Sequence, residues 1–502
     1  MLIFIYNTIL TSRISINKLI FYTSIFYKSK NKFKIMSMIS KFRDINPETA
    51  FLIIGLIYGI GFLLATPAFQ VPDEYEHFYR AVYVSEGHIV PEKLGDKSGV
   101  YVPESIQRTS LTIQNEWYSF INDRNQNLNI TSLLYIPFKS KYMVFEDISR
   151  IAVVTYSPVP YIISGFAISL GKIFNLSPLV LMYLGRLANL LSWVLLTYYA
   201  IKITPVHKWV LFMISFIPLT LLEAASLSAD SFMLGLSFLI IAIFLKYAFK
   251  SSDKKLNVKD FYIFFVVLIL LSLSKQVYFA LLFLVLLIPA SKFGNWKKKL
   301  IVTAFLFTSI LLITGLWSFL VKDLYVPIVP QISIFGQILY ITGDPFRFPY
   351  VLLNTFLQYG LSYQLLFIGN FILDIPLPVW WIGVYIISIF PVALLDKCEI
   401  EIAFKQKLIS SIIFSLVFLL LCAFVYISWT PVGQNTINGI QGRYFIPILP
   451  LLFILFYKWS YWKNFDQKIP KIFINNINLI ITGYVTFYLS ITLLIFLINY
   501  HI

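Results

Sequence analysis

Residues 50–80 read AFLIIGLIYGIGFLLATPAFQVPDEYEHFYR and largely decide the fold. The first twenty residues, 50–69, contain no charged side chain and match the roughly 20 residues that an α-helix needs to cross a bilayer. The next eleven carry five charged or histidine side chains. Such an abrupt change indicates a membrane span that ends at a polar loop.

The composition extends this interpretation to the whole chain. Of 502 residues, 58% are hydrophobic and 13% are charged, against about 25% charged residues in ordinary soluble domains. Mean hydropathy is +0.78, so a single anchor on a soluble domain is excluded. The 21 glycines, 23 prolines and absence of long polar tracts exclude a disordered or collagen-like chain. Two cysteines, Cys398 and Cys422, exclude a framework of several disulfides.

Apolar runs near the length of a span recur along the chain and predict eleven transmembrane helices. Two further apolar stretches, 158–174 and 348–372, are ambiguous from hydropathy alone. The predicted spans are residues 50–69, 178–201, 209–224, 231–249, 261–274, 277–291, 300–320, 378–394, 408–427, 444–458 and 475–498.

The distribution of Lys and Arg decides between the two topologies. With a cytoplasmic N-terminus and neither ambiguous stretch crossing, most of the 40 basic residues lie on the cytoplasmic side. If 158–174 crossed, the basic clusters after it would face outward. We therefore expect an all-α integral membrane protein with about eleven transmembrane helices, two non-crossing outer-surface helices and a large first outer loop. The net charge of +16 then reflects topology, with no nucleic acid as a partner.

Two regions follow from this topology. Residues 1–44 form a basic cytoplasmic N-terminal segment, for which Met36 or Met38 is an alternative start. Residues 45–502 form the polytopic domain, with outer loop 70–150. Polar segments 226–231, 322–347 and 428–443 and the turn at Lys275 fall on the same outer face. Any chemistry is therefore expected at the outer boundary of the membrane.

The strongest local motif is residues 71–80, VPDEYEHFYR. Pro72 suits the first position of a helix, with Asp73 and Glu74 in its first turn, and Asp73, His77 and Arg80 share one helical face. One interpretation is a capped surface helix held by internal ion pairs. The other is a carboxylate that accepts a proton from a hydroxyl or binds a divalent cation beside a lipid phosphate.

Later segments supply further candidate ligands of an anionic substrate. A glycine-rich loop precedes Arg443, whose guanidinium suits a phosphate, although Arg443 also fits an interfacial anchor. Lys275 interrupts an apolar run, as a binding group or as a turn between short spans. Asp230 is either a ligand of the substrate or, structurally, the N-cap of a helix. The remaining candidates are Tyr156, Arg186, Gln441 and Tyr444.

The common signatures of soluble enzymes are missing from the sequence. It contains no P-loop, no G-x-G-x-x-G, no H-E-x-x-H and no paired C-x-x-C. The four histidines are scattered, so a histidine-based metal site is not expected.

Together the motifs carry a family resemblance. They are P-D-E-x-x-H-F-x-R-A at 72–81, Y-S-P at 156–158, A-S-x-S-x-D at 225–230, K-x-V-Y at 275–278 and W-T-P-x-G with G-x-Q-G-R-Y-F-x-P across 429–447. Over about residues 45–460 the chain resembles the multi-pass bacterial membrane family known as domain of unknown function 2142. That family is grouped by resemblance with the GT-C glycosyltransferases, which use polyprenyl-phosphate sugars outside the membrane.

The resemblance implies a GT-C-like fold and a set of roles. Asp73 would be the general base or the residue that positions the acceptor, with Glu74 as its neighbour in the same role; if a metal takes part, both would be ligands of Mg²⁺ or Mn²⁺. Arg443 and Lys275 would neutralise the leaving phosphate. The expected substrate-binding residues as a whole are His77, Arg80, Tyr156, Arg186, Asp230, Lys275, Gln441, Arg443 and Tyr444.

The expected function is transfer of a sugar from a polyprenyl-phosphate donor to an envelope glycan or lipid-linked acceptor, at the outer face of the bacterial cytoplasmic membrane. Its partners would be the lipid bilayer, a polyprenyl-phosphate-linked sugar and an envelope glycan acceptor. Two alternatives stay open: a transporter or flippase of a lipid-linked saccharide, and a non-catalytic membrane protein of envelope assembly.

Overall fold

The computed structural model describes residues 44–122, 131–140, 142–149, 152–250, 255–368, 377–395, 400–458 and 476–501. The predicted N-terminal segment up to residue 43 and Cys398 lie outside these ranges. The fold is mostly helical, and among the described residues six helices are long and apolar enough to cross a membrane. They are α4 (Pro47–Ala65), α8 (Pro178–Ile203), α11 (Ala229–Phe249), α13 (Trp296–Leu320), α17 (Phe404–Trp429) and α21 (Ile477–His501).

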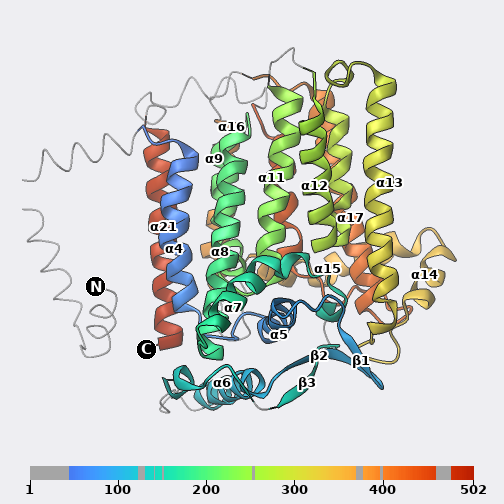
Figure 1. The fold of residues 1–502 in the computed structure, drawn as a ribbon. Coiled ribbons are helices and arrows are strands. Elements are labelled where there is room, and N and C mark those ends of the chain that lie inside the picture. The colour runs from blue at the N-terminus through green and yellow to red at the C-terminus, as the bar shows by residue number, and fades with distance from the viewer. Residues whose placement is uncertain are drawn as a thin grey trace, which may run out of the picture.

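The long helices stand side by side in one bundle (Figure 1). Helix α8 packs against α4 on one side and α11 on the other, and α21 packs against α4. In the most apolar part of α11, 78% of residues are buried, against 17% in α13. Helix α11 is therefore central, and α13 presents most of its apolar surface outward, as a helix facing lipid does.

Other predicted spans are shorter or broken. Segment 209–224 forms two short helices because Pro218 begins a new helix at its first position. Residues 277–291 lie mainly in a 3₁₀-helix, and the prolines of 444–458 divide that stretch into short turns. The count of eleven crossings thus stays a prediction. The elements concerned are α9 (Lys208–Ser215), α10 (Pro218–Ala224), α12 (Val258–Ser274), η4 (Gln276–Leu287), α16 (Val379–Leu394), η7 (Gly442–Tyr444), η8 (Ile446–Ile448) and α18 (Leu449–Ile454).

The predicted outer loop, residues 70–150, contributes a small mixed layer at one end of the bundle (Figure 1). It contains α5 (Glu74–Ser85), α6 (Glu104–Asn122) and a three-stranded antiparallel sheet in the order β1 (Glu92–Leu94), β2 (Lys97–Pro103) and β3 (Met143–Asp147). The expectation of an all-α protein is wrong here. Leu94 pairs with Lys97 around Gly95, whose φ of +61° suits a tight hairpin turn.

The ambiguous stretch 158–174 forms η3 (Val159–Tyr161) and α7 (Ile162–Ile173). Helix α7 lies across the lower end of the bundle in Figure 1. Its 12 residues rise about 18 Å, short of the roughly 30 Å hydrocarbon core. Gly165 brings α7 close to the backbone of α5, because a Cβ there would lie 3.3 Å from the carbonyl oxygen of Ala81. The second stretch, 348–372, lies largely in α15 (Arg347–Ile368), which follows α14 (Ile334–Thr342).

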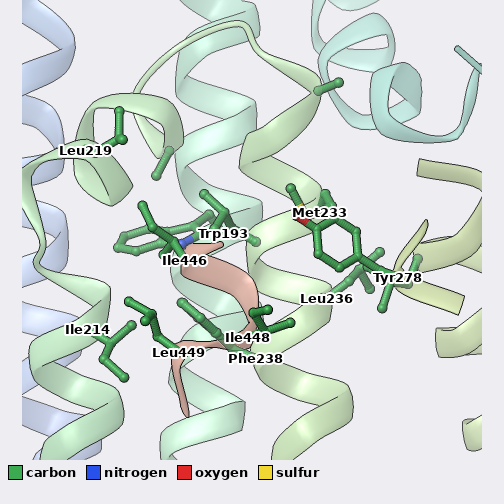
Figure 2. Packing of buried hydrophobic residues seen from close by; sticks show 14 of the residues in the cluster. Trp193, Ile214, Leu219, Met233, Leu236, Phe238, Tyr278, Ile446, Ile448 and Leu449 are labelled. Carbon is green, nitrogen blue, oxygen red and sulfur yellow. The ribbon is translucent and has the colours of Figure 1, made fainter. Parts of the chain in front are cut away.

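The buried core joins the C-terminal segment to the central helices. Figure 2 shows Ile446, Ile448 and Leu449 between side chains of α8 and α11, including Trp193. Ile446, Ile448 and Trp193 are fully buried. Because this run is buried in the core, it holds the backbone of Arg443, three residues earlier, near the N-terminal end of α11, where Asp230 lies.

Candidate functional site

A pocket of about 410 Å³ lies where the predicted outer loop, residues 70–150, meets the bundle. Each of the segments predicted to share the outer face contributes to its wall, which confirms that they converge. Eight predicted site residues line it: Asp73, His77, Tyr156, Asp230, Lys275, Gln441, Arg443 and Tyr444. Glu74, Arg80 and Arg186 are not part of its wall.

Arg443 is the centre of the charged end of the pocket. Its Nη2 lies 3.2 Å from Oδ2 of Asp73, its Nη1 lies 2.9 Å from Oε1 of Glu223, and its Nε lies 3.5 Å from Oδ2 of Asp230. The guanidinium thus meets three carboxylates on three different segments. Its predicted approach to Asp73, 370 positions away in sequence, is confirmed.

Lys275 completes the cluster. Helix α12 ends at Ser274, and the ammonium of Lys275 lies 3.0 Å from Oδ1 of Asp230 and 4.2 Å from the centre of the Tyr444 ring. Lys275 therefore marks a turn between two helical segments and also forms an ion pair. Asp230 is not the N-cap of α11, because Ser228 caps that helix and accepts from the Asp230 backbone N–H.

Asp73 immediately precedes α5, which begins at Glu74 rather than at Pro72 as expected. Its φ of +64° lies in the left-handed region, which aspartate tolerates better than most residues. Its side chain makes no capping hydrogen bond and is 23% exposed, against 9% for Asp230 and 1% for Glu223. Asp73 is therefore the carboxylate of the cluster most accessible from the pocket.

The neighbouring Glu74 has quite different surroundings. Both it and Arg186 are fully buried, with Arg186 Nε 2.8 Å from Oε1 and Nη2 2.5 Å from Oε2. The Glu74 oxygens also accept the backbone N–H groups of Phe69 and Leu227. This pair ties α4, α5, α8 and the loop before α11 together and supports the backbone beside Asp73.

His77 and Arg80 extend from Asp73 along α5. Nδ1 of His77 lies 2.7 Å from the Tyr161 hydroxyl, and burial lowers the pKa of His77 to about 4, although Asp73 opposes that shift. Arg80 Nη2 donates to the backbone oxygens of Ile89 and Tyr156, and burial lowers its pKa to about 10. His77 is therefore neutral at pH 7 and faces the pocket, while Arg80 braces the loop around Tyr156.

Glu223 is the charged group that the sequence reasoning missed. It lies in α10, within the apolar segment 209–224, and is its one acidic residue. An ionisable group inside a predicted span is a signal for a function or an ion pair, and here the partner is Arg443.

Asp73 and Glu74, the expected ligands if a metal takes part, do not together form a cation site in this arrangement. All acceptor positions of Glu74 are used by Arg186 and two backbone N–H groups, and the Asp73 carboxylate contacts a guanidinium. Among the described residues, no group of three or more His, Cys, Asp or Glu side chains is placed to hold a metal ion.

The pocket wall also includes apolar side chains. Trp317 and Val321 at the end of α13, Ile328 in the following loop, Ile334 in α14 and Phe424 in α17 line it. Ile328, Ile334 and Phe424 are also 51%, 40% and 49% exposed, so the pocket opens over an apolar rim. A pocket wall that combines a charged cluster with partly exposed apolar side chains suits an amphiphilic ligand.

These features define a multi-pass helical membrane protein with a polar pocket at one end of its bundle. The chain belongs to the family described as "Predicted membrane protein (DUF2142)", whose model matches residues 56–452. The matched range includes every predicted site residue. No curated protein and no solved structure matches the chain.

Proposed function

We propose that this protein is a membrane glycosyltransferase that transfers a sugar from a polyprenyl-phosphate donor to a hydroxyl group of an envelope acceptor. The observation that carries the proposal is the position of Asp73, a partly exposed carboxylate, in one pocket with Arg443 and Lys275. A base beside two cations meets the needs of a reaction that deprotonates a hydroxyl and releases a phosphate.

The chemistry assigns one task to each group. The Asp73 carboxylate accepts the proton of the acceptor hydroxyl as its oxygen forms a bond to the anomeric carbon of the sugar. The bond from that carbon to the phosphate oxygen breaks, and its electron pair stays on the phosphate. Arg443 and Lys275 stabilise the resulting negative charge. This proposal omits Glu74 and Arg186, whose contacts with each other account for both.

Two other features of the pocket support a lipid-linked sugar as the donor. The apolar rim of Ile328, Ile334 and Phe424 suits a hydrocarbon chain. Oε1 of Gln441 is buried without a hydrogen-bond partner among the described residues, and a sugar hydroxyl could donate to it.

We also propose that the pocket faces the outside of the bacterial cytoplasmic membrane, with the N-terminus in the cytoplasm and a GT-C-like arrangement of about eleven crossings. Figure 1 supports an odd number, because α4 starts at the end of the bundle opposite the outer loop and α21 ends at the same end as that loop.

A second candidate, transport of a lipid-linked saccharide, is favoured by the broken helices at the site. Lys275 lies at the break between α12 and η4, and Arg443 lies in the short turn η7. Transporters commonly bind their substrates at interrupted helices.

Purified protein in detergent separates the two candidates, because a micelle has no compartments between which to transport. With a panel of polyprenyl-phosphate sugars and an envelope-glycan acceptor, the transferase forms a glycosidic bond. Asp73→Asn should lower the rate by about 10²–10⁴, the usual contribution of a positioned base. Asp344→Asn, the same change at an exposed carboxylate away from the pocket, is the matched control. Absence of product from wild-type protein across the panel would favour transport, and full activity of Asp73→Asn would remove Asp73 from the mechanism.

A further inference from the structure

The cluster of charged groups around Arg443 already contains more anions than cations. Asp73, Glu223 and Asp230 face Arg443 and Lys275, so the ionised cluster has one excess negative charge. An anionic ligand added to this cluster would be repelled. An anionic ligand therefore binds well only if one of the three carboxylates leaves its contact with a cation.

The two terminal nitrogens of Arg443 have unequal partners. Nη1 is held by Glu223, whose side chain is 1% exposed and does not line the pocket. Nη2 faces Asp73, which does line it. Glu223 therefore fixes one end of the guanidinium, and the other end points toward ligand.

Of the three carboxylates, Asp73 is the least restrained by its surroundings. Asp230 contacts Lys275 as well as Arg443, and Glu223 is enclosed in the core. The Asp73 side chain makes no capping bond to α5. Its backbone is held nonetheless, because the adjacent Glu74 is bound by Arg186, so the side chain can turn while the main chain stays in place.

We infer that the Asp73 carboxylate occupies the subsite for the substrate's phosphate, on Nη2 of Arg443, and that the phosphate replaces it when the donor binds. The inference rests on the donor class proposed above. A polyprenyl-phosphate sugar is a phosphodiester with one negative charge, so the exchange leaves the charge of the subsite unchanged. Asp73, released from the guanidinium, becomes available as a base only after the donor has bound. Glu223 is a positioning residue that keeps Arg443 in place during the exchange.

The test measures binding without an acceptor, so it is independent of transfer. Dissociation constants of a short-chain polyprenyl phosphate and of inorganic phosphate are measured in detergent for wild type, Asp73→Asn and Glu223→Gln. Asp73→Asn removes the competing anion and should tighten binding of the lipid phosphate about tenfold. Glu223→Gln neutralises the same charge at the other end of Arg443, keeps an oxygen that can accept from Nη1, and should change binding less than threefold.

Asp73→Gly provides a second removal of the carboxylate, at a φ of +64° that glycine adopts readily. Unchanged or weaker binding of the lipid phosphate by both Asp73 variants would overturn the exchange. Equal tightening by Glu223→Gln would also overturn it, because only the summed charge would then matter. If the Asp73 variants bind inorganic phosphate more tightly but do not bind the lipid phosphate, the ligand of the subsite is not a lipid headgroup. If wild-type protein forms no glycosidic bond but the three proteins show the expected binding pattern, the proposed reaction is refuted and the exchange stands.

Discussion

The buried pair Glu74–Arg186 gives the sharpest test of the distinction between two adjacent carboxylates. All five N–H groups of the Arg186 guanidinium have acceptors, two on Glu74 and three on the backbone carbonyls of Leu63, Thr66 and Pro67. Glu74 accepts four hydrogen bonds in return. Removing the charge of Glu74 would leave Arg186 as an uncompensated cation in a fully buried place.

Glu74→Gln should therefore lower the free energy of unfolding by about 3–5 kcal/mol, the usual effect of breaking a buried ion pair from one side. The native Cys422, fully buried in α17, reports unfolding through its reaction with a thiol dye, in protein carrying Cys398→Ser. The matched variant Glu76→Gln changes a buried glutamate two residues away and controls for general sensitivity of α5.

The outcome also separates structural and catalytic roles. A supporting role predicts that Glu74→Gln loses stability, with activity falling only in proportion to folded protein. A stability equal to wild type, combined with loss of transfer in the folded protein, would refute the supporting role and return Glu74 to the chemistry first expected of it.

Three further predictions concern the site and the topology. Arg443→Lys should lower turnover at least tenfold in folded protein, because an ammonium cannot contact Glu223 and a ligand phosphate in a forked geometry; an unchanged rate would count against the subsite. Because burial lowers the pKa of His77 from 6.5 to about 4, the unfolded chain binds the extra proton between these pH values. Stability should thus fall by about 3 kcal/mol as pH drops from 6.5 to 4, and tryptophan fluorescence should show a smaller fall in His77→Gln. An impermeant thiol reagent on intact cells should label Tyr118→Cys and spare Lys297→Cys in a protein without native cysteines, whereas the reverse pattern would invert the proposed orientation.

Local sequence patterns predicted much of the site because they set which side of the membrane each polar group occupies. Lys275, Arg443 and Asp73 are each attached to the end of an apolar segment, and the distribution of Lys and Arg assigns those ends to one face. Residues confined to one thin layer of a compact bundle have few places to lie apart. Their observed convergence in one pocket follows from that restriction.

What the sequence by itself determined was a multi-pass helical membrane protein with its polar groups gathered at one end. Only the tertiary structure separated Asp73, which lines the pocket, from Glu74, which is buried against Arg186. Asp73 precedes α5 with a left-handed backbone and Glu74 begins the helix, so their surroundings depend on where α5 starts and on how α4 and α8 pack around it. Tertiary packing likewise brought Glu223 to Arg443 across 220 positions, since a carboxylate within an apolar run does not indicate which distant cation it meets.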